Sequence, residues 1–254
     1  MSPPRLLRST WRALGPAAAT LVLAATSVHA RPNRWRAQWL ATDFTRTTVV
    51  FVEIRSGGGP KDGIPAIWAP EFRRVTTEHR PDDPEPLMPL EIGDDARVHP
   101  GCYLMWHENV NDVVGGVPMA VTLCPLCNSA MAFEARVDGA RRSFGIPRKL
   151  RHSDMLMYDR ETESWRQRAT GEGIVGRHTG ARLQPLPSWM ESWVEVRVRN
   201  PDKLVPDEPD WRCAYARTSM WSMAPPRGPS SMTARTRRTG FPRWSGCSGC
   251  RTAP

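Results

Sequence analysis

Residues 117–139 read VPMAVTLCPLCNSAMAFEARVDG and carry the strongest evidence for the architecture. Apolar side chains occupy every second position of their first part, at Val117, Met119, Val121 and Leu123. Such alternation is typical of a strand with one buried face, and residues 130–137 alternate in the same way. The Asp-Gly pair at 138–139 is a strong turn signal for a β-hairpin. The stretch therefore predicts a strand, a Cys-Pro-Leu-Cys loop, a second strand and a tight turn.

Shorter signals lie on both sides of this stretch. β-Branched and aromatic residues predict strands at Thr47–Ile54, Arg142–Ile146 and Met155–Tyr158. Four prolines and three acids predict a surface loop at Pro81–Pro89. Trp189–Val198 is the best helix candidate of the second half.

The length of 254 residues is enough to bury a real core, and 25 scattered prolines exclude a coiled coil or helical bundle. Short strands separated by turn signals predict a mainly β fold, a single sandwich- or barrel-like domain with minor helices. We expect this domain over residues 47–215, after an N-terminal extension at residues 31–46.

The net charge of +9 comes from the two ends of the chain. Residues 1–30 and 216–254 contain ten of the 35 basic residues and no acid, so residues 31–215 carry 25 basic and 26 acidic residues. A nucleic-acid-binding face needs clustered Lys and Arg on the folded part of a protein. We therefore expect no nucleic-acid partner.

The N-terminus has the order of a secretory signal peptide. Three arginines precede an apolar run at residues 13–26, and Val28 and Ala30 supply the small residues of a cleavage site. The alternative is a membrane anchor, but the run is shorter than the ~20 apolar residues of a spanning helix. We expect cleavage after Ala30, an exported protein (periplasmic or extracellular), and no stable membrane span in the mature chain.

The composition changes sharply after Tyr215. Asp210 is the last acid, and residues 216–254 consist largely of Arg, Pro, Ser, Thr and Gly without apolar periodicity. One interpretation is a natural, basic tail of low order. The other is a frameshift, because a GC-rich gene that is read out of frame yields this mixture.

Six cysteines are present, and four of them form two pairs with CxxC spacing, Cys124/Cys127 and Cys247/Cys250. Two such pairs can bind zinc. These pairs are too far apart for a zinc ribbon, however, and the second pair lies in the tail of altered composition. The candidate centre is therefore Cys124 with Cys127.

One interpretation of this centre is a thiol–disulfide redox pair, since export suits disulfide chemistry. By analogy, Cys124 would be the more exposed, attacking thiol and Cys127 the resolving thiol. Such motifs need a helix after the first Cys to lower its pKa. Residues 128–137 alternate like a strand instead, which counts against this interpretation.

A second interpretation is a metal knuckle. Rubredoxins and zinc ribbons build knuckles from a strand, Cys-Pro-x-Cys, a residue that tolerates positive φ (here Asn128) and another strand. Both thiolates then point to one centre, which would hold a transition metal such as zinc, iron or copper. Two ligands are too few, and the candidates for the others are His107, Cys102 and His152.

The third interpretation is structural. Cys124 and Cys127 would form a stabilising disulfide or remain two buried core thiols. The chain would then be a non-catalytic extracytoplasmic binding or scaffold module. Its ligand would contact surface aromatics, although packing in the core is the commoner role for each of the candidates Trp106, Trp165, Trp189 and Trp193.

A second polar motif covers residues 106–112, which read WHENVND. On a helix, His107 and Asn111 would share a face. The pattern is close to the HExxH zinc motif, but Asn111 replaces the second His. His107 is then either a ligand beside the CxxC or a structural hydrogen-bonding residue. Glu108, Asn111 and Asp112 are further polar site candidates.

Together these motifs resemble the bacterial and archaeal family called domain of unknown function 3179, over about residues 60–215. In order, the resemblance is carried by GIPAI at 63–67 with Pro70 and Phe72, His107-Glu108, Asn111-Asp112, Gly115-Gly116, VTLCPLC at 121–127, Phe144-Gly145, Leu150-Arg151, MYDR at 157–160, and Trp165. The chain departs from the family at Asn128, at residues 152–154 and in its tail. The resemblance implies a fold and an exported habitat but no reaction, so whether the chain is an enzyme stays open. The leading expectation is an exported protein whose CxxC, supported by His107, binds a metal or performs thiol redox chemistry.

Overall fold

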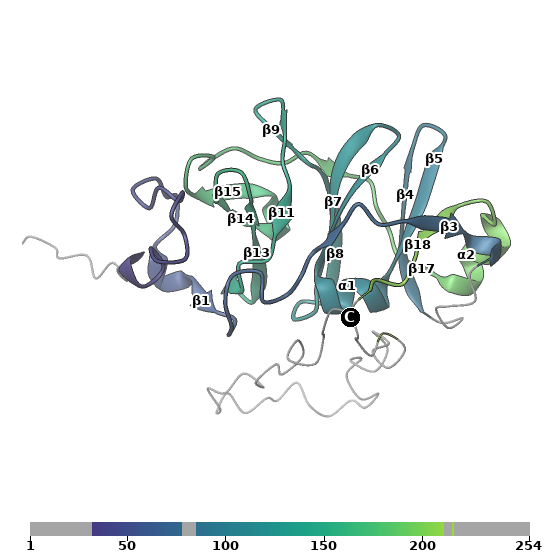
Figure 1. Ribbon diagram of the computed structural model, residues 1–254, viewed down its shortest axis with the longest axis horizontal. Coiled ribbons are helices and arrows are strands. Elements are labelled where there is room, and N and C mark those ends of the chain that lie inside the picture. Colours follow the sequence, from purple (N-terminus) through teal and green to yellow (C-terminus); the bar gives the residue numbers. More distant parts are fainter. Residues whose placement is uncertain (1–31, 78–84, 211–214, 216–254) are drawn as a thin grey trace, which may run out of the picture.

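The structure is a computed structural model that describes residues 32–77, 85–210 and 215. Three large β-sheets lie side by side along the long axis of the molecule (Figure 1). The mainly β prediction is therefore confirmed, with two α-helices and no closed barrel in the described part of the chain. The expected signal peptide, residues 1–30, and the tail, residues 216–254, lie outside the described residues.

The first sheet has the order β1-β12-β13-β14-β15, with β11 also paired to β13. Its strands are β1 (Arg55–Ser56), β11 (Phe144–Gly145), β12 (Lys149–Arg151), β13 (Asp154–Asp159), β14 (Trp165–Gln167) and β15 (Glu172–Val175). The middle sheet has the order β16-β8-β7-β6-β2. Its strands are β2 (Ile67–Trp68), β6 (Asn109–Val114), β7 (Val117–Cys124), β8 (Ser129–Glu134) and β16 (Pro185–Leu186).

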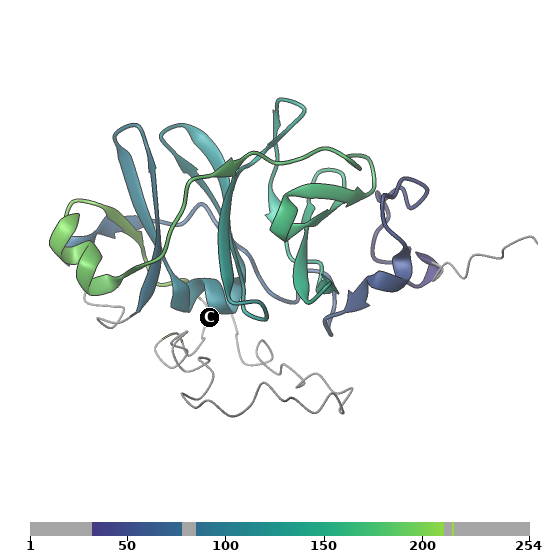
Figure 2. The same ribbon diagram turned by 180° about the vertical axis from the view of Figure 1, so that it is seen from behind.

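The third sheet has the order β17-β4-β5-β18-β3. Its strands are β3 (Phe72–Arg74), β4 (Pro86–Ile92), β5 (Asp95–Pro100), β17 (Glu191–Ser192) and β18 (Leu204–Pro206). A small hairpin pairs β9 (Arg136–Val137) with β10 (Ala140–Arg141) through the predicted Asp138-Gly139 turn. Helix α1 (Gly101–His107) contacts strands of the middle and third sheets, and α2 (Trp193–Arg199) lies at the far end of the third sheet (Figure 2).

Strand β7 confirms the strand predicted at Val117–Leu123, but both of its faces are buried. Met119, Val121 and Leu123 pack in one core with side chains of α1 and β4. Ala120 and Cys124 point to the opposite face and pack in a second core with side chains of the first sheet. The middle sheet is thus enclosed between two cores, which explains why buried residues run almost without a break along β7.

Trp35 and Trp39, in the predicted extension, pack on Tyr158 and Trp165 of the first sheet. The strand predicted at Thr47–Ile54 is wrong, because Phe51–Glu53 is a 3₁₀ helix. Phe51 and Ile54 are buried in the aromatic cluster around Trp35, Trp39 and Trp165, whereas Val50 and Val52 are exposed. Burial of two residues three positions apart requires a helical turn rather than alternation.

Two further expectations are corrected in part. Prolines and acids predicted a loop at Pro81–Pro89, but Pro86–Ile92 is strand β4, while residues 81–84 lie outside the described part. The helix predicted at Trp189–Val198 starts later, at Trp193, because Ser192 and Glu195 form a capping box. No helix within the described ranges is both long enough and apolar enough to span a membrane.

Candidate functional site

The Cys-Pro-Leu-Cys loop closes the hairpin between β7 and β8. Cys124 and Ser129 are the last paired residues, and Asn128 adopts a φ of 46° in the loop. An asparagine tolerates this left-handed conformation better than most residues. The hairpin predicted by the knuckle interpretation is therefore present, and no helix follows Cys124.

A third potential ligand joins the two cysteines. The sulfur atoms of Cys124 and Cys127 and a carboxylate oxygen of Asp154 all lie within 4.8 Å of one another. Asp154 begins β13 of the first sheet, whereas both cysteines belong to the middle sheet. The site therefore spans two sheets.

The two cysteines have opposite environments. Cys124 is fully buried, whereas Cys127 is exposed, so the assignment of Cys124 as the more exposed thiol is wrong. Burial and the contact with Cys127 raise the pKa of Cys124 to about 12, although backbone N–H groups of Cys127 and Met155 bind its sulfur. The reason is that Cys124 is the last residue of a strand with two buried faces, whereas Cys127 lies in the loop that follows.

Arg168 connects Cys127 to Asp154. Its Nη2 lies 3.2 Å from the Cys127 sulfur and 2.6 Å from Asp154 Oδ1, and its Nε donates to the same oxygen at 2.8 Å. It also donates to the hydroxyl and the carbonyl of Ser129. The Cys127 sulfur contacts Ser129 Oγ at 3.1 Å and Asp154 Oδ1 at 3.4 Å. The sulfur of Cys127 thus contacts polar groups from three segments.

The acceptor positions of Asp154 are already in use. Oδ1 accepts two hydrogen bonds from Arg168, while Oδ2 accepts from Gln167 Nε2 and from the backbone N–H of Ala169, each at 2.8 Å. A carboxylate offers about four acceptor sites. A metal ion on Asp154 would therefore have to displace Arg168 and leave its buried guanidinium beside another cation.

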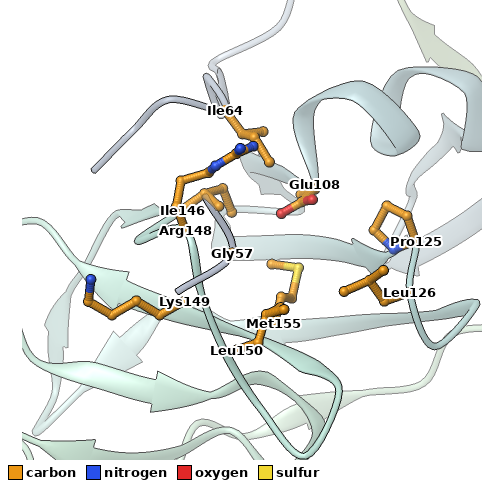
Figure 3. Close-up of a pocket in the computed structure, with 10 residues that line it drawn as sticks. All are labelled: Gly57, Ile64, Glu108, Pro125, Leu126, Ile146, Arg148, Lys149, Leu150 and Met155. Carbon is orange, nitrogen blue, oxygen red and sulfur yellow. The ribbon is translucent and has the colours of Figure 1, made fainter. Parts of the chain in front are cut away.

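An apolar cavity of about 60 Å³ lies on the inner side of the CxxC loop. Pro125, Leu126, Met155 and other apolar side chains line it, and the carboxyl group of Glu108 points into it (Figure 3). Burial raises the pKa of Glu108 to about 7, although Arg148 and Arg168 oppose that shift. The cavity thus contains one carboxyl group that changes its charge near neutral pH.

The other predicted ligands lie outside the cluster around Cys124. His107 Nδ1 lies 2.7 Å from the carbonyl of Pro65, and its Nε2 lies 2.6 Å from the Tyr215 hydroxyl. Cys102 is buried beside Tyr215, and burial, together with Glu85, raises its pKa well above the ordinary value. His152 is exposed, with Nε2 3.8 Å from a carboxylate oxygen of Glu53. The geometry of His107 matches its structural interpretation.

The polar motif is not one helix. Helix α1 ends at His107, Glu108 is its left-handed cap with a φ of 57°, and Asn111 lies on β6. The expected shared face of His107 and Asn111 is therefore wrong. Asn111 instead clamps β11, because it donates to the carbonyl of Phe144 and accepts from its N–H, at 2.9 and 2.7 Å.

Asp112 forms a partly buried ion pair with Arg97 at 2.7 Å and lies 3.4 Å from His99, and it does not belong to the cluster of Cys124, Cys127 and Asp154. Of the tryptophans considered as ligand-binding, Trp165 and Trp193 are buried in cores, Trp106 is partly buried and Trp189 is 43% exposed. Trp189 is thus the one exposed residue among these four.

The sequence interpretation missed Asp154, Arg168 and Ser129 as members of the site. Asp154 lies two residues after His152, which is the candidate ligand of that segment, and Ser129 lies two residues after Cys127. Arg168 lies 41 residues from Cys127 along the chain and has no local motif. Only the pairing of β13 with β14 brings it next to Asp154.

A family model with the description "Protein of unknown function (DUF3179)" matches residues 61–243, which is more than half of the chain. The match continues past residue 215 into the segment of altered composition. The frameshift stays a prediction, which resequencing of the 3′ end of the gene would check. No curated protein and no solved structure matches the chain.

Proposed function

The chain belongs to the DUF3179 family of proteins of unknown function, and from that premise we propose that Cys124 and Cys127 are a dithiol that is reversibly oxidised by exchange with disulfide substrates. The observation that carries this proposal is the position of Cys127, an exposed residue whose sulfur lies within 4.8 Å of the sulfur of buried Cys124 and 3.2 Å from the Arg168 guanidinium. A thiolate is the nucleophile in such exchange, and an exposed cysteine can meet a disulfide substrate.

The proposed reaction balances in two steps. The Cys127 thiolate attacks one sulfur of the substrate disulfide, the substrate S–S bond breaks, and one substrate thiolate leaves. Cys124 then loses its proton and attacks the Cys127 sulfur, which releases the second substrate thiolate. The substrate disulfide is reduced to two thiols, and the protein is oxidised to the Cys124–Cys127 disulfide.

A metal centre is the second candidate, because the hairpin has the form of a knuckle and three ligand atoms lie within 4.8 Å of one another. Removal of one partner from a buried ion pair typically costs about 3–5 kcal/mol, and a metal on Asp154 would have to displace Arg168. Zinc, iron or copper would then depend on the two thiolates alone. This cost makes the dithiol the better-supported function.

The test uses the purified chain prepared without added metal or chelator, with Cys213, Cys247 and Cys250 replaced by Ser. We expect glutathione disulfide to convert the chain to a form that has lost two thiols, and peptide mapping to locate a Cys124–Cys127 bond. Cys102→Ser should leave this conversion unchanged, whereas Cys127→Ser should abolish it. Elemental analysis of the same sample decides the alternative, since a stoichiometric metal lost in Cys124→Ser would replace the dithiol by a metal centre.

A third outcome is a purely structural bond. If both Cys→Ser changes lower stability but the native pair never exchanges with glutathione, the proposal fails and the scaffold interpretation replaces it.

Export to an oxidising compartment is part of the proposal. It is supported by the signal-like order of residues 1–30, and it gives the dithiol an environment in which disulfides persist. N-terminal sequencing of the protein from the producing cells should find Arg31 at the start. An intact Met1 would contradict export by this route.

A further inference from the structure

We propose that one face of the first sheet carries a buried site for a small, singly charged oxyanion, formed by Arg142, Arg166, His178 and Asp159. The inference starts from Arg166 on β14, whose side chain is fully buried. Its Nη1 donates to two backbone carbonyls, whereas Nε and Nη2 have no hydrogen-bond partner among the described residues. None of the carboxylates described forms an ion pair with it. A fully buried arginine is rare unless it has a counterion, so this one calls for an anion.

The strand register places Asp159 on the same face as Arg166. Arg166 pairs with Met157 on β13, and Asp159 follows Met157 by two residues. Paired residues, like residues two apart on a strand, point to the same face of a sheet. Asp159 is fully buried as well. Its Oδ1 accepts from the backbone and the hydroxyl of Thr162, whereas Oδ2 has no hydrogen-bond partner in the described part of the chain.

A loop covers this face and brings His178 to it. Gly173 pairs with Arg166, and a Cβ atom on Gly173 would lie 2.0 Å from the His178 carbonyl. Glycine therefore lets the loop lie directly on the strand. The His178 N–H donates to Ser164 Oγ at 3.1 Å, and the Ser164 carbonyl accepts from the N–H of Asp159. His178 is thus buried beside both charged groups, and its Nε2 has no hydrogen-bond partner within the described ranges.

The charges of the site sum to one positive charge. Arg142 is partly buried, acts electrostatically on Arg166 and His178, and has an unpartnered Nε in the chain as described. Burial lowers the pKa of Arg166 to about 10 and also lowers the pKa of His178, so at neutral pH the guanidinium is charged and the imidazole is neutral. Two guanidinium groups and the Asp159 carboxylate remain. Asp138, 3.2 Å from His178 Nδ1, is largely exposed to solvent. One singly charged anion therefore balances the buried charges.

The unpartnered atoms indicate which anion fits. The guanidinium groups supply N–H donors, which bind anionic oxygens. Asp159 Oδ2 is an acceptor. His178 Nε2 is an acceptor too, because Nδ1 faces the Asp138 carboxylate and holds the ring proton. An oxyanion that carries a proton satisfies both kinds of group, and hydrogencarbonate combines a single negative charge with an O–H group in a small molecule.

Calorimetric titration of the purified chain with sodium hydrogencarbonate, in mildly alkaline buffer, tests the inference. Sodium nitrate is the control, since nitrate has the same shape and charge but no proton. We expect saturable binding of hydrogencarbonate, roughly 10-fold tighter than that of nitrate. Arg142→Gln, at a partly exposed position, should weaken this binding roughly 10-fold or more. Arg182→Gln, which removes an exposed arginine paired with Glu172, should leave it unchanged.

Arg166→Met should abolish binding, and circular dichroism checks that this variant is folded. If it is not, Arg142→Gln decides the test. Unchanged binding in Arg142→Gln, or no saturable binding by the wild-type chain, would overturn the inference. Nitrate that binds as tightly as hydrogencarbonate would also contradict it, because the Asp159 acceptor would then have no role. The site contains no thiol, so none of these outcomes bears on the dithiol function.

Discussion

The surroundings of Cys127 and Cys124 differ although only two residues separate the cysteines. Around Cys127, the buried pair of Arg168 and Asp154 and the side chain of Ser129 form a set of charged and polar contacts. Cys124 packs in an apolar core with Ile64, Ile146 and Met155, and these three residues also line the cavity that contains Glu108. Cys124 ends a buried strand, whereas Cys127 lies in the four-residue loop at 125–128, so the two residues differ in exposure although their sulfur atoms lie within 4.8 Å of each other.

This difference teaches that the two thiols are suited to different steps. Cys127 is exposed and can react with a substrate disulfide. Cys124 is buried, and its pKa of about 12 keeps it protonated, so it reacts only after Cys127 has formed the mixed disulfide. The following changes test whether the polar side and the apolar side behave as differently as their contacts indicate.

The largest effect is expected from Arg168→Met. The change leaves the Asp154 carboxylate without its main cation, and breaking a buried pair in this way typically costs about 3–5 kcal/mol. Urea unfolding should show this loss in the free energy of unfolding. Arg182→Met, which breaks the more exposed pair with Glu172, should cost less than about 1 kcal/mol. Equal losses for the two variants would contradict the expectation that the buried Arg168–Asp154 pair matters more for stability than the exposed pair.

Glu108 on the apolar side should make stability depend on pH. Its pKa is about 7 in the folded chain against an ordinary value of 4.5, so the folded state keeps a proton that the unfolded state has lost. The free energy of unfolding should therefore fall as pH rises from 4.5 to 7, by at most about 3 kcal/mol. Glu108→Gln should remove this component, as urea unfolding across the range would show, while Glu134→Gln should keep it.

Alkylation should separate the thiols directly. With iodoacetamide at neutral pH, Cys127 should react roughly 100-fold faster than Cys124, since only Cys127 is exposed and the other thiol is held protonated. Peptide mapping over time measures both rates, with buried Cys102 as an internal slow reference. Similar rates for Cys124 and Cys127 would remove the asymmetry on which the order of the two steps depends.

The smallest effect is expected at the rim. Leu126 is 47% exposed, so Leu126→Ala should change the free energy of unfolding by less than about 0.5 kcal/mol. Met155, at the base of the same cavity, is buried, and Met155→Ala should cost about 2–5 kcal/mol. A large decrease in the free energy of unfolding for Leu126→Ala would contradict this expectation. It would show that Leu126 is buried in solution and separates the cavity from water.

The fold could be predicted where a strand keeps one regular pattern. The alternation before Cys124 correctly predicted strand β7, and the Asp138-Gly139 turn correctly predicted the small β9–β10 hairpin. The pattern did not reveal that Thr47–Ile54 turns to bury Phe51 and Ile54, because the aromatic cluster that receives them is assembled from distant segments. Tertiary packing overrode the strand preference of β-branched residues there.

Of the candidate site, only the Cys-Pro-Leu-Cys loop could be predicted from the sequence. The CxxC spacing and Asn128 identified the loop, since these features act within a few residues. Asp154 and Arg168 join it from another sheet, and local spacing contains no information on that pairing. The relative exposure of the two thiols was predicted in reverse, because alternation along β7 does not tell that its second face is also covered.

The aromatic cluster at the other end of the molecule has a spectroscopic consequence. Trp165 lies 5.1 Å from Trp35 and 5.0 Å from Trp39 between ring centroids, with the planes inclined by 67° and 73°. Indole transitions at such separation and inclination couple as excitons and add their own bands to the far-ultraviolet circular dichroism spectrum. Secondary-structure content deduced from that spectrum would be distorted, and the same bands would report on the packing of Trp35 and Trp39 against the first sheet.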